Sequence, residues 1–198
     1  MKKILTSVVA LGLLASLYAG QAFGISIEDV KLNGQNADAV WGPNGGNENL
    51  SFVNTAFQNS YGGGAFSLLD KTDSGSVPFG TTTFTIEAVG GNSGTFLLSW
   101  VDNNIPPAKY FDLVFALKAS NSFALYLFDD VAFTTADGEY GGTYEIKFDP
   151  NGQGIFPDLS HVSVYGRAAS TPVPEPATML LFGAGLVGLA GFARRKVQ

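Results

Sequence analysis

Hydrophobic and polar residues alternate along the central part of the chain, as they do in β-strands with one buried face. In Thr82–Val89, the side chains of Phe84, Ile86 and Ala88 share one face and polar side chains share the other. No segment outside the two ends of the chain has a helical period. Including this segment, the alternation predicts strands over Ser26–Leu32, Leu50–Phe57, Ala65–Leu69, Thr82–Val89, Thr95–Val101, Tyr110–Leu117, Phe123–Phe128, Gly142–Phe148 and Ser160–Gly166.

Turn signals separate the predicted strands. Gly90–Gly94 and Asp102–Pro107 are rich in Gly, Asn, Asp and Pro, which favour turns. The four strands between Thr82 and Phe128 therefore read as an antiparallel meander. Most phenylalanines and Trp100 fall on inward faces. The whole pattern predicts an all-β fold, an antiparallel β-sandwich with a jelly roll as one form of it.

The N-terminal residues have the order of a secretory signal peptide. Lys2 and Lys3 precede an apolar stretch, Val8–Leu17, and Gly20 and Ala22 place small residues where signal peptidase needs them. We expect residues 1–22 to be a signal peptide, with cleavage after Ala22. An uncleaved anchor is the alternative, but the apolar stretch is short for a membrane span.

The C-terminal residues predict a membrane helix. Ala177–Ala193 is an apolar run whose one polar side chain is Thr178, and as a helix it would be about 25 Å long. That length is at the short end of what spans a hydrocarbon core of about 30 Å. The basic residues that follow should stay in the cytoplasm; they are Arg194, Arg195 and Lys196. These ends leave residues 23–170 as one β-sandwich domain and residues 171–198 as a tail.

The charge of the central domain bears on its partners. Sixteen of the seventeen acidic residues but only six of the eleven basic ones lie between Phe23 and Ser170. This imbalance argues against nucleic-acid binding, which depends on Lys and Arg contacts to phosphate. The chain has no cysteine, so thiol catalysis and disulfides are excluded.

The central domain shows no catalytic constellation, and we expect it not to be an enzyme. His161 is the one histidine, and no Gly-x-Ser-x-Gly turn presents a serine to it. One histidine without cysteine also cannot supply the usual structural zinc ligands. The carboxylates of Asp129, Asp130, Asp137 and Glu139 are close in sequence, and a glycosidase would need two of them across a cleft. Turn formation by Asp is the simpler interpretation.

Two weaker signals concern ligands. Asp149–Gly154 resembles the start of a calcium loop but lacks the third carboxylate and the terminal Glu of an EF-hand, so we interpret it as a turn. We expect no cofactor, with a weak Ca²⁺ site as the alternative. Trp41, Tyr61 and Tyr140 lie in segments that read as polar loops, where rings can stack on sugars. Trp41 is the residue that we expect to contact a sugar.

The order of parts in the tail resembles a known sorting signal. Val173, Pro174, Glu175 and Pro176, then the apolar run, then the basic residues resemble the PEP-CTERM sorting signal of Gram-negative bacteria. The resemblance implies processing near Pro-Glu-Pro by an exosortase-like membrane protease and a cell that makes exopolysaccharide. The helix would hold the protein in the membrane before processing.

These observations predict an exported protein of the cell surface or extracellular matrix with a structural or adhesive role. It would cross the inner membrane and first face the periplasm. The alternative is a carbohydrate-binding module for exopolysaccharide, and a third hypothesis is a hydrolase with a carboxylate pair.

Overall fold

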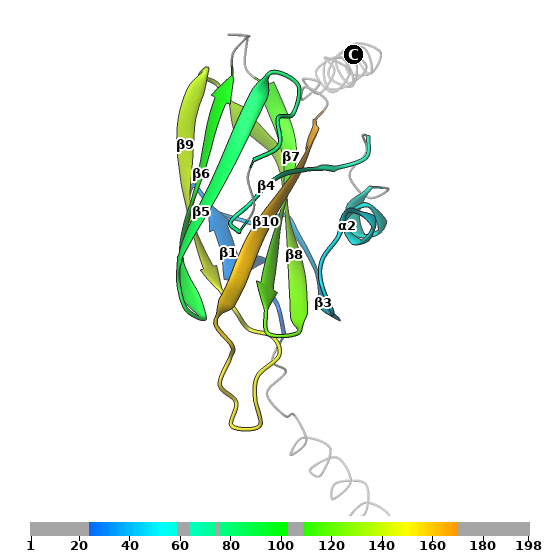
Figure 1. Ribbon diagram of the computed structural model, residues 1–198, viewed down its shortest axis with the longest axis vertical. Helices are drawn as coiled ribbons and strands as arrows, with labels where there is room; N and C mark the ends of the chain where they lie inside the picture. The colour runs from blue at the N-terminus through cyan, green and yellow to red at the C-terminus, as the bar shows by residue number, and fades with distance from the viewer. Residues whose placement is uncertain (1–23, 59–63, 74–75, 103–108, 170–198) are drawn as a thin grey trace, which may run out of the picture.

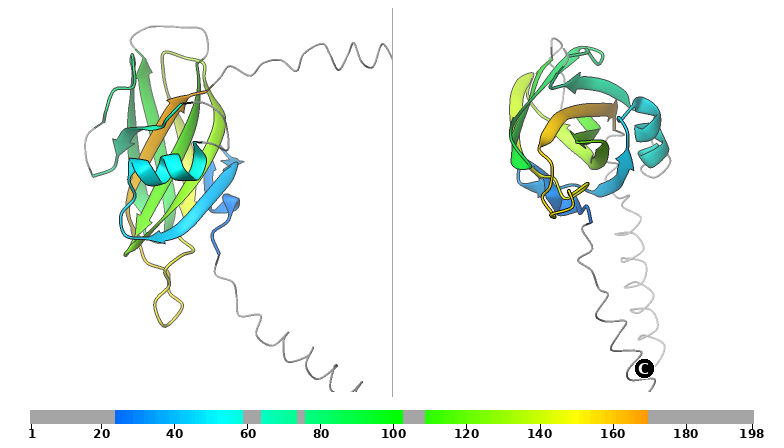
Figure 2. Two further views of the ribbon diagram at one scale, coloured as in Figure 1. Left: turned by 90° about the vertical axis from the view of Figure 1, so that its right-hand side faces the viewer. Right: turned by 60° about the horizontal axis from the view of Figure 1, so that its bottom comes forward.

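The computed structural model describes residues 24–58, 64–73, 76–102 and 109–169 (Figure 1). Within them, two five-stranded antiparallel sheets pack face to face as a sandwich, and Figure 2 shows the two layers from the side and from below. The predicted antiparallel β-sandwich is confirmed. The predicted signal peptide, the tail from 171 to 198 and Tyr61 lie outside the described residues.

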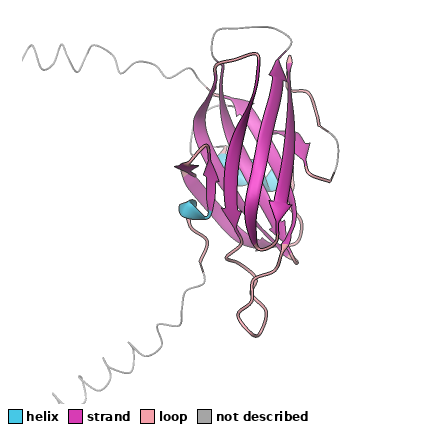
Figure 3. Cartoon of the chain, turned by 90° about the vertical axis from the view of Figure 1, so that its left-hand side faces the viewer, coloured by secondary structure: helices cyan, strands magenta, loops and turns pink. Residues whose placement is uncertain are grey.

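The strands of each sheet come from distant parts of the chain. The first sheet has the order β2 (Gln35–Asn36), β1 (Val30–Leu32), β9 (Asp137–Glu145), β6 (Ser93–Asp102), β5 (Thr82–Gly90). The second has the order β3 (Ala39–Gly45), β8 (Ser122–Phe133), β7 (Lys109–Ala119), β10 (Leu159–Ala168), β4 (Ser67–Lys71). A 3₁₀ turn, η1 (Ile27–Asp29), precedes β1. Strands dominate the described chain in Figure 3.

The predicted four-stranded meander is wrong. β5 and β6 form a hairpin in the first sheet, and β7 and β8 form a hairpin in the second. β6 pairs next with β9, and β7 pairs next with β10. The chain therefore changes sheets between Asp102 and Lys109. Alternation fixes which face of a strand is buried, but it does not say which strand lies beside it.

The prediction of a strand over Leu50–Phe57 is also wrong, because these residues form helix α2 (Leu50–Phe57). Asn49 caps its N-terminus, and its Oδ1 accepts a hydrogen bond from the Phe52 amide at 3.1 Å. Val53 and Phe57, one helical turn apart, are its buried residues and belong to a core cluster with residues of β7 and β8. α2 covers the outer face of the second sheet (Figure 2).

The main core lies between the sheets. Phe111, Leu113 and Phe115 of β7 are buried there, on the face predicted from alternation. The Phe84 and Phe111 rings from opposite sheets meet edge to face, with centroids 5.4 Å apart. Trp100 is 4 % exposed and joins the same cluster, so its predicted place in the core is confirmed.

Both faces of β7 and β8 are buried, since α2 and its neighbours cover the outer face. This double burial explains why the two strands read as nearly continuous apolar runs. Among the described residues, no helix is long and apolar enough to cross a membrane. The apolar run 177–193 is not among them.

Candidate functional site

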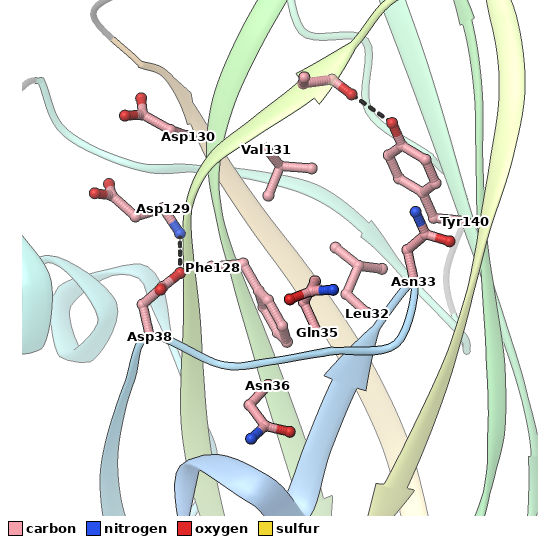
Figure 4. Close-up of a pocket in the computed structure, with 11 residues that line it drawn as sticks. Leu32, Asn33, Gln35, Asn36, Asp38, Phe128, Asp129, Asp130, Val131 and Tyr140 are labelled. Carbon is pink, nitrogen blue, oxygen red and sulfur yellow. Dashed lines mark hydrogen bonds between the residues drawn. The ribbon is translucent and has the colours of Figure 1, made fainter. Parts of the chain in front are cut away.

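A pocket of about 410 Å³ lies where the β1–β2 hairpin meets the C-terminal part of β8 and the start of β9 (Figure 4). Its volume is within the range of small-ligand sites. Amide, carboxylate and apolar side chains share its lining. The lining residues are Leu32, Asn33, Gln35, Asn36, Asp38, Phe128, Asp129, Asp130, Val131, Ala132 and Tyr140.

The amide side of the pocket comes from a tight hairpin. Asn33 and Gly34 both have positive φ angles, 49° and 79°. An Asn-Gly pair with these angles is the favoured two-residue turn between antiparallel strands. The backbone N–H of Asn33 donates a hydrogen bond to the Gly141 carbonyl at 2.7 Å, which ties the turn to β9. The hairpin thereby presents the exposed side chains of Asn33, Gln35 and Asn36 at the pocket.

The acidic side of the pocket comes from a bulge. The register of β7 and β8 shifts between Phe111 and Leu113, and Asp130 has a φ of 52°. The shift brings carboxylate oxygens of Asp112, Asp129 and Asp130 within 4.8 Å of one another. Asp112 Oδ1 accepts a hydrogen bond from the Asp130 amide at 3.2 Å.

Asp38 adds a fourth carboxylate from the segment between β2 and β3. Its Oδ2 accepts a hydrogen bond from the Asp129 amide at 2.8 Å, shown as a dashed line in Figure 4. The bond joins residues 91 positions apart in the sequence. It holds the Asp38 side chain at the pocket beside the bulge.

Arg167 neutralises the deepest of these carboxylates. Its Nε donates to Asp112 Oδ2 at 2.7 Å, and its Nη1 donates to the Gly64 carbonyl at 3.2 Å. The guanidinium also lies over the Phe66 ring, 4.4 Å from the centroid. Arg167 is 2 % exposed and Asp112 is 3 % exposed. The arginine is thus committed to the interior and does not line the pocket.

This arrangement of carboxylates changes the pKa of Asp129. Burial, with hydrogen bonding to Asp112 and the charges of Asp112, Asp130 and Asp38, raises the pKa of Asp129 to about 6. The negative charge of the pocket therefore increases as the pH rises through that value.

The carboxylates could hold a hard cation such as Ca²⁺, which prefers oxygen ligands. Arg167 already balances Asp112, so the excess charge comes from Asp38, Asp129 and Asp130. The sequence interpretation of Asp129 as a turn residue missed this cluster. Asp137 and Glu139 are exposed on β9, and neither lines the pocket.

Tyr140 forms an aromatic wall of the pocket. It lies in β9 and not in a loop, so the predicted loop position is wrong; its hydroxyl donates to the Ala132 carbonyl. Its ring packs against Trp100 with centroids 4.8 Å apart. Glycines and polar residues around Tyr140 gave β9 the composition of a loop.

Trp41 also lies in a strand, β3, so its predicted loop position is wrong. Its half-buried ring packs against Phe52 and Phe123, with centroid distances of 6.1 and 6.3 Å. Gly42 and Pro43 follow it at an irregularity in the β3–β8 ladder. Trp41 is not part of the pocket described above.

His161 of β10 contacts two carboxylates that lie outside the strands. Its Nε2 lies 2.7 Å from Glu48 Oε1, and its Nδ1 lies 3.6 Å from Asp73 Oδ2. Ser163 donates to the same Glu48 oxygen at 2.8 Å. Burial of Glu48 opposes its ionisation, but the bonds from His161 and Ser163 outweigh this effect and hold the pKa of Glu48 below its usual value.

The segment from Asp149 is a turn, as predicted. Asn151 Oδ1 accepts hydrogen bonds from the amides of Gln153 and Ile155 at 2.9 and 3.0 Å. An Asn side chain bound to backbone two residues ahead is a common turn device.

Sequence reasoning did not identify the pocket, although two signals for it were present. Asn33-Gly34 between short apolar segments indicates a hairpin. Asp112 is the one charged residue in the otherwise hydrophobic run Tyr110–Leu117, and a buried carboxylate there requires a partner. Neither signal shows that the hairpin and the acidic cluster lie side by side, because only the folded chain brings them together.

The tail supplies the similarity to known proteins. Residues 172–196 match the model of the PEP-CTERM protein-sorting motif. No curated protein and no solved structure matches the chain. The predicted resemblance in the tail is confirmed, and such a motif implies processing by an exosortase and sorting to the cell surface. The chain thus carries a PEP-CTERM protein-sorting motif, a signal for exosortase processing, after a β-sandwich domain.

Proposed function

We propose that this protein is a non-enzymatic structural or adhesive component of the cell surface or extracellular matrix of a Gram-negative bacterium. The observation that carries the proposal is the sorting motif at 172–196, which follows a β-sandwich ending at Ala168. The tail would deliver the domain across the inner membrane and hold it at the periplasmic face until an exosortase acts. The sandwich would then act outside the cell.

The arrangement of ionisable side chains supports a role without catalysis. The side chains of His161 and Ser163 are both bound to the same oxygen of Glu48, so each is already engaged with that carboxylate. The carboxylates of Asp112, Asp129 and Asp130 gather at one bulge, whereas the two carboxylates of a glycosidase flank the scissile sugar bond. Asp112 is also neutralised by Arg167.

Cell fractionation tests the proposed location. An antibody against the β-sandwich should find it in the surface or matrix fraction of wild-type cells. In cells without the exosortase it should stay with the membrane fraction. Equal amounts in the matrix of both strains would contradict the proposal.

A second candidate function is binding of exopolysaccharide, and the pocket beside the β1–β2 hairpin favours it. Amides and carboxylates can hydrogen-bond sugar hydroxyls, and the Tyr140 ring can cover an apolar sugar face. The proposed contact at Trp41 would be a separate, half-buried aromatic surface. Retention of the protein on a column of its own matrix polysaccharide tests this function, and passage without delay would remove it.

A further inference from the structure

We infer that the pocket between the β1–β2 hairpin and the end of β8 binds a glycan without acidic groups and rejects acidic polysaccharides. The inference rests on the second candidate function above and adds the class of sugar. Neutral sugars and sugars that carry an amine belong to the accepted class. Uronic acids and phosphorylated or sulfated sugars belong to the rejected class.

The negative charge of the pocket lining is the reason to expect that acidic sugars are rejected. Asp38, Asp129 and Asp130 line the pocket, and within the described ranges no Lys, Arg or His does. Arg167, which balances Asp112 of the same acidic cluster, is not part of the lining, since its Nε is bound to Asp112 and its Nη1 to a backbone carbonyl. An acidic sugar would therefore meet carboxylates with no cation to balance its own charge, and like charges at close range repel.

The uncharged side chains of the lining are the reason to expect that neutral sugars bind. Asn33, Gln35 and Asn36 offer amide groups that both donate and accept, which matches the hydroxyls of a neutral sugar. The β1–β2 hairpin supplies all three of these side chains, which are labelled in Figure 4. Phe128, Val131 and Tyr140 supply the apolar and aromatic surface, as Figure 4 shows.

Hydrogen bonds fix the backbone of the hairpin and of the bulge, which carry the polar side chains of the pocket. The Asn33 amide is bound to Gly141 of β9, and the Asp129 amide is bound to Asp38. These bonds tie the hairpin side and the acidic side to different sheets of one sandwich. A site fixed in this way loses less conformational freedom on binding than a flexible loop would.

Titration calorimetry with the purified full-length chain in mild detergent tests the inference. The probes are neutral glucan oligosaccharides, oligomers of deacetylated hexosamine, and oligouronates of equal length, at pH 7.5 with EDTA. We expect binding of the first two probes and at least tenfold weaker binding of oligouronate. Equal binding of oligouronate, or binding only after Ca²⁺ is added, would overturn the inference.

Two variants locate the effect. Asp130→Asn should raise the affinity for oligouronate severalfold relative to the affinity for neutral glucan, because it removes one negative charge from the lining. Asn tolerates the positive φ at this position. Asn36→Ala should weaken neutral-glucan binding, and Asn47→Ala, an exposed change away from the pocket, should not. No change with Asp130→Asn would place any binding elsewhere and contradict the inference.

The same experiment distinguishes a wrong sugar class from the absence of any glycan binding. If oligouronate alone binds, exopolysaccharide binding stands and the inferred sugar class is wrong. If none of the probes binds, both the second candidate function and the inference fall.

Discussion

Arg167 of β10 lies directly opposite Asp112 of β7 in the ladder between these strands, and its Nε contacts Asp112 Oδ2 at 2.7 Å. Both residues are almost completely buried. Asp112 lies at the bulge that carries Asp129 and Asp130, so the pair links the interior of the second sheet to the acidic side of the pocket. Its removal should affect both.

Arg167→Met should destabilise the domain by about 3–5 kcal/mol, because it leaves the buried Asp112 carboxylate without a counter-charge. Urea unfolding at pH 7 measures the change. The double variant Arg167→Met with Asp112→Leu should regain much of the loss, since an apolar pair replaces the ion pair. Lys31→Met, at an exposed position, serves as the control. A loss below about 1 kcal/mol for the single variant would contradict this role.

Asp129→Asn should stabilise the domain at pH 7.5 by about 1 kcal/mol, allowing for partial solvent screening. The folded pKa of Asp129 is raised to about 6, while an unfolded Asp has a pKa of about 3.9. The folded state therefore holds this proton more tightly, and wild-type stability falls as the pH rises through about 6.

The advantage of Asp129→Asn should accordingly disappear below about pH 4, where the wild-type carboxyl is protonated in both states. Urea unfolding from pH 3.5 to 8 measures it. Asp137→Asn, on the exposed side of β9, should show no such trend. An advantage that is the same at every pH would show that charge repulsion is not its cause.

Glu48→Gln should destabilise the domain at pH 6 by about 1–2 kcal/mol, because the charged acceptor of two hydrogen bonds is lost. The pKa of Glu48 is lowered by folding, so its contribution is present above the unfolded pKa of about 4.3 and is lost as the pH falls through the folded value. The gap between variant and wild type should close in acid.

Denaturation at pH 6 and pH 3 checks the Glu48 prediction, with exposed Glu87→Gln as the matched control. A gap that widens in acid would reverse the predicted sign and refute it.

Asn49→Ala should cost about 1 kcal/mol, because it removes the side-chain cap of α2. The helical signal should be lost in the same transition as the rest of the fold, and the midpoint of that transition should be lower than in the wild type. The reason is that Val53 and Phe57 pack the helix against the second sheet. Asn47→Ala, two residues earlier and exposed, is the control. Equal effects of the two variants would show that the cap contributes nothing specific.

Alternation allowed the sandwich to be predicted because a strand buried on one face needs apolar side chains at every second position. It placed Phe111, Leu113 and Phe115 on the correct face. It failed at Leu50–Phe57, where the apolar residues fit a helical face and the Asn49 cap favours a helix. It also failed at β3 and at the start of β9, where glycine, proline and polar residues concealed strands.

The pocket could not be predicted from the sequence because its parts meet only in the folded chain. The bond between Asp38 and the Asp129 amide spans 91 positions, and the bond between Arg167 and Asp112 spans 55. The register shift beside Asp112 has no marker in the sequence. The sorting motif differs because all of its parts are contiguous, so the sequence alone was enough to identify it.

The C-terminal residue of the mature protein tests the central claim most directly. Mass spectrometry of the protein from wild-type cells and from cells without the exosortase measures it. We expect wild-type protein to end close to Val173–Pro176 and the protein from exosortase-deficient cells to extend to Gln198. A surface or matrix form that ends at Gln198 in both strains would contradict exosortase processing of this chain.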